Sequence, residues 1–381
     1  MSVLRDITAG TFRASPHRRL LSRERAPGRA LQALGGLAAD LNCHGVLLSR
    51  DLRGPEITAV CHNTARLLRT LRAPGPLPPE IRRPAHGSRE LAAKLVLDDV
   101  LELEVQGHFV SGLAAYPHVF QGSPDTATRG YTGRLSIDGL KYGQRLGVSD
   151  PALLSARLYR YNTAPASPRT SRWPAPSAAE IEGQLALAAG GRAAAWRLAE
   201  PVEERDGWTA WSNAAAGGSY SRDRVYKLYI SPLIEDLRAA LPPVINAIAR
   251  SDAIAFKLGR GPYGLLRPDK LVVYFGSLAD LLEMTKALRP RLAGIRPQGV
   301  PFSASITPDG LLSWGLDPPR ERQTWGAETE ESWRSWVTNR LATALRLAAD
   351  GDGEVEPWEF ALERLRLEGV DTGTFAPIQC A

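Results

Sequence analysis

The sequence predicts an α+β fold, with a mixed sheet and helices in the C-terminal domain and a smaller α/β region before it. Two observations support this prediction. Five apolar segments of strand length lie between residues 224 and 316, and four segments with helical spacing lie between or after them. Strands and helices alternate at first and helices then close the chain, but the strands are too few and irregular for a doubly wound sheet.

The predicted strands are short apolar runs bounded by turn residues. They cover residues 224–230, 253–258, 270–275, 302–306 and 312–316. The predicted helices repeat apolar residues every three or four positions, and they cover residues 233–249, 278–292, 330–349 and 357–367. Earlier in the chain we expect a helix over 29–41 and a helix passing into a strand over 90–104.

Composition divides the chain into four parts. Residues 1–27 are rich in arginine and serine and have few apolar anchors, which predicts a flexible basic tail. Residues 28–163 predict an α+β domain that would be available for peptide capture. The stretch APASPRTSRWPAPS at 164–177 has the composition of a linker. Residues 178–381 then form the second domain.

The region between the linker and the first predicted strand gives a weaker pattern. Residues 178–198 are alanine-rich and predict a helix, whereas residues 200–220 look irregular and carry Trp208 and Trp211. These tryptophans are either core residues or part of a surface that captures a peptide.

Overall composition is that of a globular protein. The chain has 381 residues, 44% of them hydrophobic, a net charge of +6 and a pI near 9.3. No apolar run is long enough for a membrane span, and three cysteines fit a reducing compartment. We therefore expect a cytoplasmic protein that binds an anionic partner, with neither a membrane nor nucleic acid among its partners.

The first basic segment, RVYKLYIS, carries polar side chains along one face. Side chains alternate across a strand, so Lys227, Tyr229 and Ser231 lie together, while Arg224 lies on the opposite face. An ammonium, a phenol and a hydroxyl in one line are suited to binding an anion.

The second segment, AIAFKL, places Lys257 on the face opposite Phe256 and Leu258. Its neighbours on that face are alanines, so nothing obstructs the lysine stem. Partial burial favours the neutral amine and lowers its pKa, and a neutral amine can act as a base. Lys257 is therefore the predicted proton acceptor.

A glycine-rich loop with two more cations follows. Arg260 and Arg267 offer planar forks that match phosphate, and Asp269 could orient Arg267 or Lys270. Taken singly, each cation also fits a solvated strand face or a turn ion pair. Cations that lie close together repel one another unless an anion is among them. The group therefore predicts an anion site more strongly than any single residue does.

Several motifs do not lead to a function. Gly259, Gly261 and Gly264 match G-x-G-x-x-G, but a predicted strand and no helix follows, so we expect no nucleotide there. Kinase motifs are absent from the sequence. The pairs Cys43-His44 and Cys61-His62 lack metal-ligand spacing, and we expect no metal.

All six histidines precede residue 120. An acid or base in the C-terminal half must therefore be a lysine, a tyrosine or a carboxylate, unless the first domain contributes His108 or His118.

Three segments resemble the HopA-type effector family: RVYKLYISP, AFKLGRGPYGLLRPDKLVVYF and PFSASITPDGLLSWGLDPP. They look most like its actinobacterial members, the lyase partners in class V lanthipeptide and related thioamide peptide biosynthesis. The resemblance covers residues 222–345. It implies a cofactor-independent lyase that removes phosphate from phosphoserine or phosphothreonine in a precursor peptide, leaving dehydroalanine or dehydrobutyrine. It also implies a separate kinase-like partner protein.

A more distant resemblance is to the phosphothreonine lyases of bacterial effectors. Those enzymes carry Lys-x-His on one strand, a lysine base on a later strand and phosphate-binding arginines. Lys227 and Tyr229 match the first pair, with tyrosine where that family has histidine, and Lys257 matches the base. Tyr229 would donate a proton or orient the phosphate. The phosphate-binding residues implied are Lys227, Arg224, Arg260 and Arg267, with Arg334 or Arg340 as a later arginine.

Two other classes of function stay open. The same basic strands could hold a phosphopeptide without reacting with it and present it to another enzyme. The protein could also be effector-like and bind host proteins.

Overall fold

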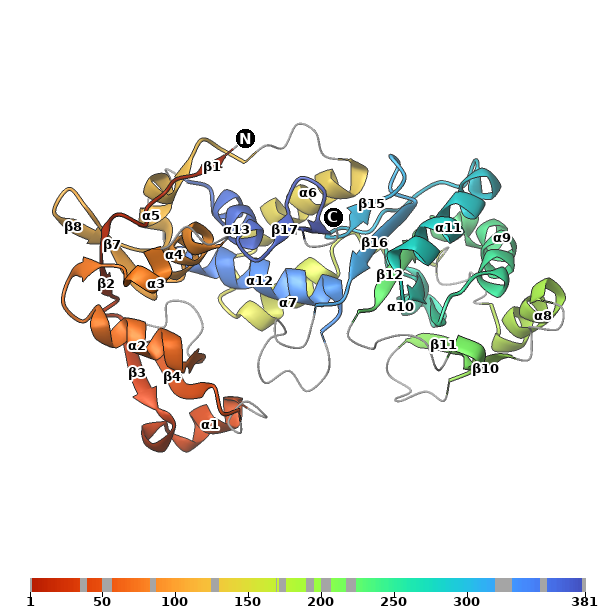
Figure 1. Cartoon of the computed structure of the whole chain (residues 1–381). Coiled ribbons are helices and arrows are strands. Elements are labelled where there is room, and N and C mark those ends of the chain that lie inside the picture. Colours follow the sequence, from red (N-terminus) through yellow and green to blue (C-terminus); the bar gives the residue numbers. More distant parts are fainter. Residues whose placement is uncertain are drawn as a thin grey trace.

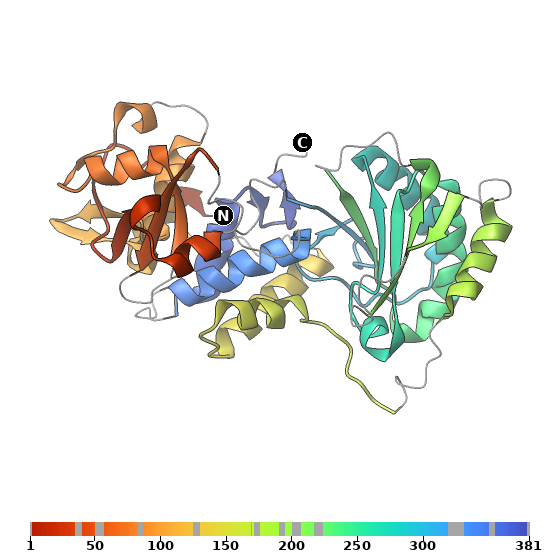
Figure 2. The ribbon, with the colours of Figure 1, turned by 90° about the horizontal axis from the view of Figure 1, so that it is seen from below.

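The computed structural model describes residues 2–34, 40–49, 57–82, 87–124, 130–168, 170, 176–189, 195–199, 207–216, 224–318, 331–349 and 355–378. These residues form an elongated molecule with two lobes (Figures 1 and 2). Antiparallel sheets and segregated helices confirm the predicted α+β class. Of the predicted linker, residues 169 and 171–175 lie outside the described residues.

The C-terminal lobe contains a seven-stranded sheet. Its strands, in spatial order, are β10 (Trp196–Leu198), β11 (Trp208–Asn213), β13 (Ala255–Gly259), β14 (Leu271–Phe275), β12 (Tyr226–Ile230), β16 (Leu312–Leu316) and β15 (Ala304–Ser305). All pairings between these strands are antiparallel, whereas the sequence predicted a mixed sheet. The five predicted strands are all present. The strand at 312–316 has the predicted bounds, the one predicted at 253–258 covers 255–259, and the other three are shorter than predicted. Strands β10 and β11 were not predicted.

One face of this sheet is covered by α8 (Ala178–Ala189), α9 (Leu237–Arg250) and α11 (Leu278–Leu288). Alternate residues of the strands, among them Leu228, Phe256 and Val273, are fully buried on this side. The helices predicted over 233–249 and 278–292 are therefore correct, although each includes a short 3₁₀ turn, Ile234–Asp236 before α9 and Arg289–Leu292 after α11.

The N-terminal lobe is built from small sheets and short helices. One sheet has the order β6 (Gly75–Pro76), β2 (Thr11–Ala14), β7 (Leu101–Val105), β8 (His108–Val110), and another the order β3 (Arg18–Ser22), β4 (Cys43–Ser49), β5 (Ile57–Cys61). A third pairs β1 (Val3–Leu4) with β9 (Phe120–Gln121). The helices are α1 (Gly28–Leu34), α2 (His62–Thr70), α3 (Pro79–Arg82), α4 (Ser88–Leu97) and α5 (Gly112–Val119).

The prediction of a flexible tail over residues 1–27 is wrong. Strand β2 pairs with β7, and β3 pairs with β4. Phe12 is 0% exposed and Ile7 lies in the same core. These two apolar side chains anchor a segment whose arginine content alone suggested disorder.

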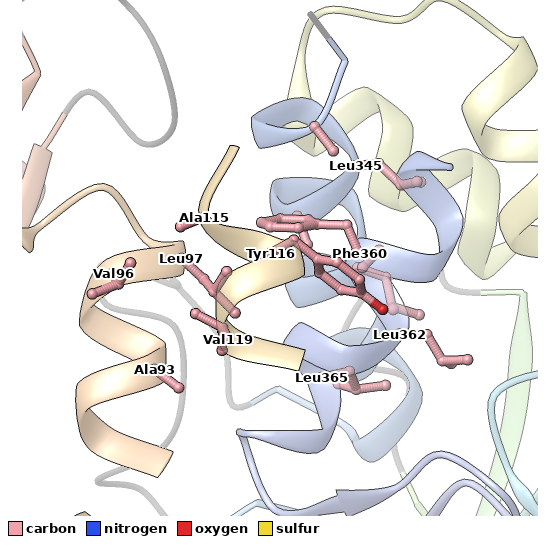
Figure 3. Packing of buried hydrophobic residues seen from close by; sticks show 14 of the residues in the cluster. Ala93, Val96, Leu97, Ala115, Tyr116, Val119, Leu345, Phe360, Leu362 and Leu365 are labelled. Atoms are coloured by element: carbon pink, nitrogen blue, oxygen red, sulfur yellow. The ribbon is translucent and has the colours of Figure 1, made fainter. Parts of the chain in front are cut away.

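The core of the N-terminal lobe is completed by the end of the chain. Helices α6 (Tyr131–Arg145) and α7 (Pro151–Tyr159) pack with α12 (Trp333–Leu347) and α13 (Pro357–Arg366). In Figure 3, Tyr116 of α5 faces Phe360 of α13, and their ring centroids are 6.2 Å apart. A short ladder of β17 (Val370–Asp371) and β18 (Ala376–Pro377) follows.

This packing differs from the predicted division into 28–163 and 178–381. Residues 333–375 share a core with the N-terminal lobe, not with the seven-stranded sheet. The reason is that α12 is apolar on several sides, with Trp336, Val337 and Leu341 all buried. Such a helix fits more than one core, and its sequence does not specify which. Among the described residues, no helix has the length and apolarity needed to cross a bilayer.

Candidate functional site

Three of the predicted site residues share the face of the seven-stranded sheet opposite its helical cover. Lys227 pairs with Tyr274 of β14, Tyr229 pairs with Val272, and Lys257 also pairs with Val272 from the other side. Directly paired residues in antiparallel strands point to the same face. Lys227, Tyr229 and Lys257 therefore lie on one surface, as the alternation in their segments predicted.

Lys257 is the unusual member of this surface. In the part of the chain that the structure describes, its amine has no hydrogen bond or ion pair, and its contacts are aromatic. The Nζ atom lies 4.2 Å from the ring centroid of Trp208 and 5.9 Å from that of Tyr274. Burial, and then the positive charges of Lys227 and Arg267, lower the pKa of Lys257 to about 8. A useful fraction of neutral amine therefore exists near neutral pH.

Lys227 has a carboxylate partner. Its Nζ atom lies 2.6 Å from Oδ2 of Asp317, just after β16. The other oxygen of Asp317 accepts a hydrogen bond of 2.8 Å from the backbone N–H of Trp333. Lys227 is only 7% exposed, so this ion pair fixes the position of its side chain on the sheet.

Arg267 forms a two-pronged ion pair with Asp269. Its Nε and Nη2 atoms donate to the two carboxylate oxygens at 2.9 and 3.0 Å, and Nη2 also donates to the hydroxyl of Tyr159 at 3.1 Å. The guanidinium lies 4.7 Å from the ring centroid of Trp208. Trp208 thus touches both Arg267 and Lys257, and links the predicted base to the predicted phosphate ligand.

Asp269 also holds a second arginine. Burial by itself would raise the pKa of Asp269, but Arg334 and Arg267 together lower it well below its usual range. The Nη1 atom of Arg334 lies 2.8 Å from Oδ2 of Asp269. The prediction that Asp269 orients Arg267 is confirmed, and Arg334 belongs to the same network.

The role predicted for Arg334 as a phosphate ligand is not supported by its surroundings. Its side chain is 1% exposed. It donates to the carbonyl oxygens of Pro301 at 3.0 Å and Tyr159 at 2.7 Å. The guanidinium therefore fixes Asp269 and the backbone around it. The alternative residue, Arg340, stacks on the ring of Trp336 at 4.1 Å.

Tyr229 is buried, and burial followed by the charge of Asp317 raises the pKa of Tyr229 well above its ordinary value. Its phenol therefore keeps its proton and can donate a hydrogen bond, but it is a poor source of a full proton. The two remaining predicted ligands are exposed: Arg224 precedes β12, and Arg260 lies at the turn between β13 and α10 (Gly261–Leu265).

The positive and negative charges of the cluster do not cancel. Lys227, Arg267 and Arg334 are positive, Asp269 and Asp317 are negative, and Lys257 adds a further positive charge when protonated. The cluster then has an excess of two positive charges. With Lys257 neutral the excess is one positive charge. In both states a bound anion such as a phosphate monoester would relieve the repulsion among the cations.

Sequence reasoning missed the residues that complete the cluster, namely Trp208, Tyr274, Asp317 and Tyr159. The alternation in WTAWSN could have placed the two tryptophans of β11 on opposite faces. Trp211 is a core residue that stacks on Phe256 with centroids 4.7 Å apart, while Trp208 lies at the site. Tyr159 comes from α7 and had no detectable signal.

The glycine-rich loop serves close packing. A Cβ atom on Gly259 would come within 2.3 Å of the carbonyl oxygen of Gly264. The loop leads into α10, a helix of five residues that was not predicted. His108 and His118 lie on β8 and α5 in the N-terminal lobe, whereas β12 lies in the other lobe (Figure 1), so neither reaches this site.

Comparison with known proteins gives limited information. No protein-family model and no curated protein matches the chain. A solved effector structure from Pseudomonas syringae pv. tomato strain DC3000 aligns with a TM-score of 0.42 and 13% identity, covering 65% of this chain and 98% of that one. One from Pseudomonas syringae pv. syringae strain 61 aligns at 0.40 and 13%, covering 65% and 96%. Similarity this low says nothing about substrate or activity.

Proposed function

We propose that this chain is a cofactor-independent phosphoserine or phosphothreonine lyase. Its substrate would be a precursor peptide phosphorylated by a separate kinase-like protein, in lanthipeptide-type biosynthesis. One observation supports the proposal above the others. The Lys257 amine has a pKa lowered to about 8 and, among the described residues, only aromatic contacts. It lies on one sheet face with Lys227, which can bind an anion.

The reaction is a β-elimination. The neutral amine of Lys257 takes the α-proton of the phosphorylated residue, and the electrons of that C–H bond form the double bond between Cα and Cβ. The Cβ–O bond breaks, and its electron pair leaves with the phosphate, which takes up a proton from solvent. Abstraction of such a weakly acidic proton requires a well-aligned base.

The other residues would act on the leaving group. Lys227 and Arg267 are fixed by Asp317 and Asp269, so they would stabilise the developing negative charge without rearranging. Tyr229 would donate a hydrogen bond to the departing oxygen, since its raised pKa keeps the phenol protonated.

The test compares Lys257→Ala and Lys257→Arg with the wild-type protein on a phosphothreonine peptide. Arginine keeps the positive charge but does not lose its proton. We expect Lys257→Arg to bind the phosphopeptide within a few-fold of wild type and to convert none of it. Mass spectrometry would follow the loss of phosphoric acid, and fluorescence anisotropy would follow binding. Conversion by Lys257→Arg at the wild-type rate would exclude Lys257 as the base.

A second candidate is a phosphopeptide-binding partner of a kinase, without catalysis. The observation that favours it is that Tyr229, the predicted proton donor, has a raised pKa and is a poor source of a proton. The same peptide assay separates the two functions. Stable binding of the phosphopeptide, with no loss of mass even when the kinase is present, would favour this second function.

A further inference from the structure

The positive charge of this protein is concentrated at its N-terminal end. Residues 1–83 contain 14 arginines, no lysine and 6 acidic residues. The rest of the chain contains 33 basic and 35 acidic residues, so it is close to neutral. The net charge of +6 therefore comes entirely from the first 83 residues.

Helix α2 presents part of this charge on one exposed face. His62, Arg66 and Arg69 recur at positions i, i+4 and i+7, which places them on one side of the helix. His44 of β4 joins them: Arg69 donates to its Nε2 atom at 2.9 Å, and its ring lies 5.2 Å from that of His62. These four residues are called the basic patch below.

The arginines around this patch form no ion pair with a carboxylate of the described residues. They are Arg19, Arg23, Arg25, Arg29, Arg66, Arg69 and Arg72. Elsewhere in the described residues several arginines do pair with carboxylates, among them Arg13, Arg267 and Arg364. Burial, and then the charges of Arg69 and His62, lower the pKa of His44, and these effects outweigh the opposing effect of the Glu24 carboxylate.

We propose that the basic patch is a docking surface for an acidic peptide segment. The planar guanidinium of arginine can donate two parallel hydrogen bonds to the two oxygens of one carboxylate. His44 accepts a hydrogen bond from Arg69, which holds that guanidinium in place. Figures 1 and 2 place α2 and β4 in the lobe opposite the seven-stranded sheet, so this surface is distinct from the lysine cluster. It does not rest on the lyase chemistry.

Composition favours a peptide over single-stranded nucleic acid. Surfaces that bind single strands combine cations with exposed aromatic rings on which bases stack. In the described ranges, the exposed side chains among tyrosine, tryptophan and phenylalanine are Tyr142 and Tyr263, and neither lies on α2 or β4. A patch of arginine and histidine without exposed tyrosine, tryptophan or phenylalanine rings fits carboxylates better than bases.

The test uses the full chain and an unphosphorylated, dye-labelled peptide of about 20 residues, half of them glutamate. Without phosphate, the probe has no reactive ester for the lysine cluster. A peptide with glutamine in place of glutamate is the neutral control. Arg66→Gln/Arg69→Gln is compared with Arg238→Gln/Arg250→Gln, which removes two exposed arginines from α9 in the other lobe.

We expect the acidic peptide to bind and the glutamine peptide not to bind in fluorescence anisotropy. Arg66→Gln/Arg69→Gln should weaken binding about fivefold or more, in line with the loss of two exposed ion pairs. The α9 variant should bind like wild type. Equal losses in both double variants would mean a diffuse charge effect and would overturn the proposal. Tighter binding of a 20-nucleotide single-stranded DNA, lost in the same variant, would overturn it in favour of nucleic acid.

Discussion

Asp269 is the carboxylate on which the arginines of the candidate site depend, and Asp269→Asn tests that dependence. Asp269 and Arg334 have side chains only 4% and 1% exposed. Removing one partner of a buried ion pair leaves the other charge uncompensated, which costs about 3–5 kcal/mol. Asparagine keeps one carbonyl acceptor, so we expect the lower end, about 3 kcal/mol of unfolding free energy.

A matched control is available in the same lobe. Asp236 pairs with Arg296 through two hydrogen bonds of 2.8 Å, but the Arg296 side chain is 59% exposed. Asp236→Asn should therefore cost no more than about 1 kcal/mol. Urea unfolding followed by tryptophan fluorescence would measure both variants. Equal losses in the two variants would refute the view that burial makes the Asp269 network essential.

The sign of the pH dependence follows from the pKa of Asp269, which is lowered in the folded protein. Its stabilisation is present above the ordinary pKa of an aspartate and is lost only as pH falls through the lower, folded-state pKa. The difference between wild type and Asp269→Asn should therefore stay constant between about pH 5 and pH 8.

Two further predictions concern lysines. Because Lys257 must be neutral to accept a proton, the conversion rate should rise with pH through its pKa of about 8. Trp208→Ala should admit water to the amine and move that midpoint upward, whereas Trp211→Ala should lower stability by about 3–5 kcal/mol without moving it. Burial lowers the pKa of Lys270 to about 7. Between pH 7 and 10 the unfolded chain therefore holds a proton that the folded chain has lost, and stability rises with pH. Lys270→Met should flatten this rise in urea titrations.

Local patterns predicted the central part of the site well. The six-residue segment AIAFKL is enough to place Phe256 and Lys257 on opposite faces of a strand, because neighbouring side chains alternate and only the phenylalanine suits a core. The same rule placed Lys227 with Tyr229. These predictions depend only on neighbours in sequence, and the strand register bears them out.

Residues that meet only through the fold could not be predicted. Asp317 reaches Lys227 because β16 pairs with β12, and a pairing between strands more than 80 residues apart has no local signal. Strand β11 was missed because Trp208 follows a stretch without regular hydrophobic alternation. Arg334 was predicted to bind phosphate, but its guanidinium is buried against Asp269 and fixes that carboxylate instead.

Helix α12 contacts both lobes of the molecule. Its apolar side chains belong to the N-terminal core, while Arg334 in its first turn holds Asp269 on the other lobe. A fragment cut at the interlobe connection, such as residues 178–318, would retain the sheet and lose this arginine. Any rotation of one lobe against the other would also pull on Asp269 and, through it, on Arg267.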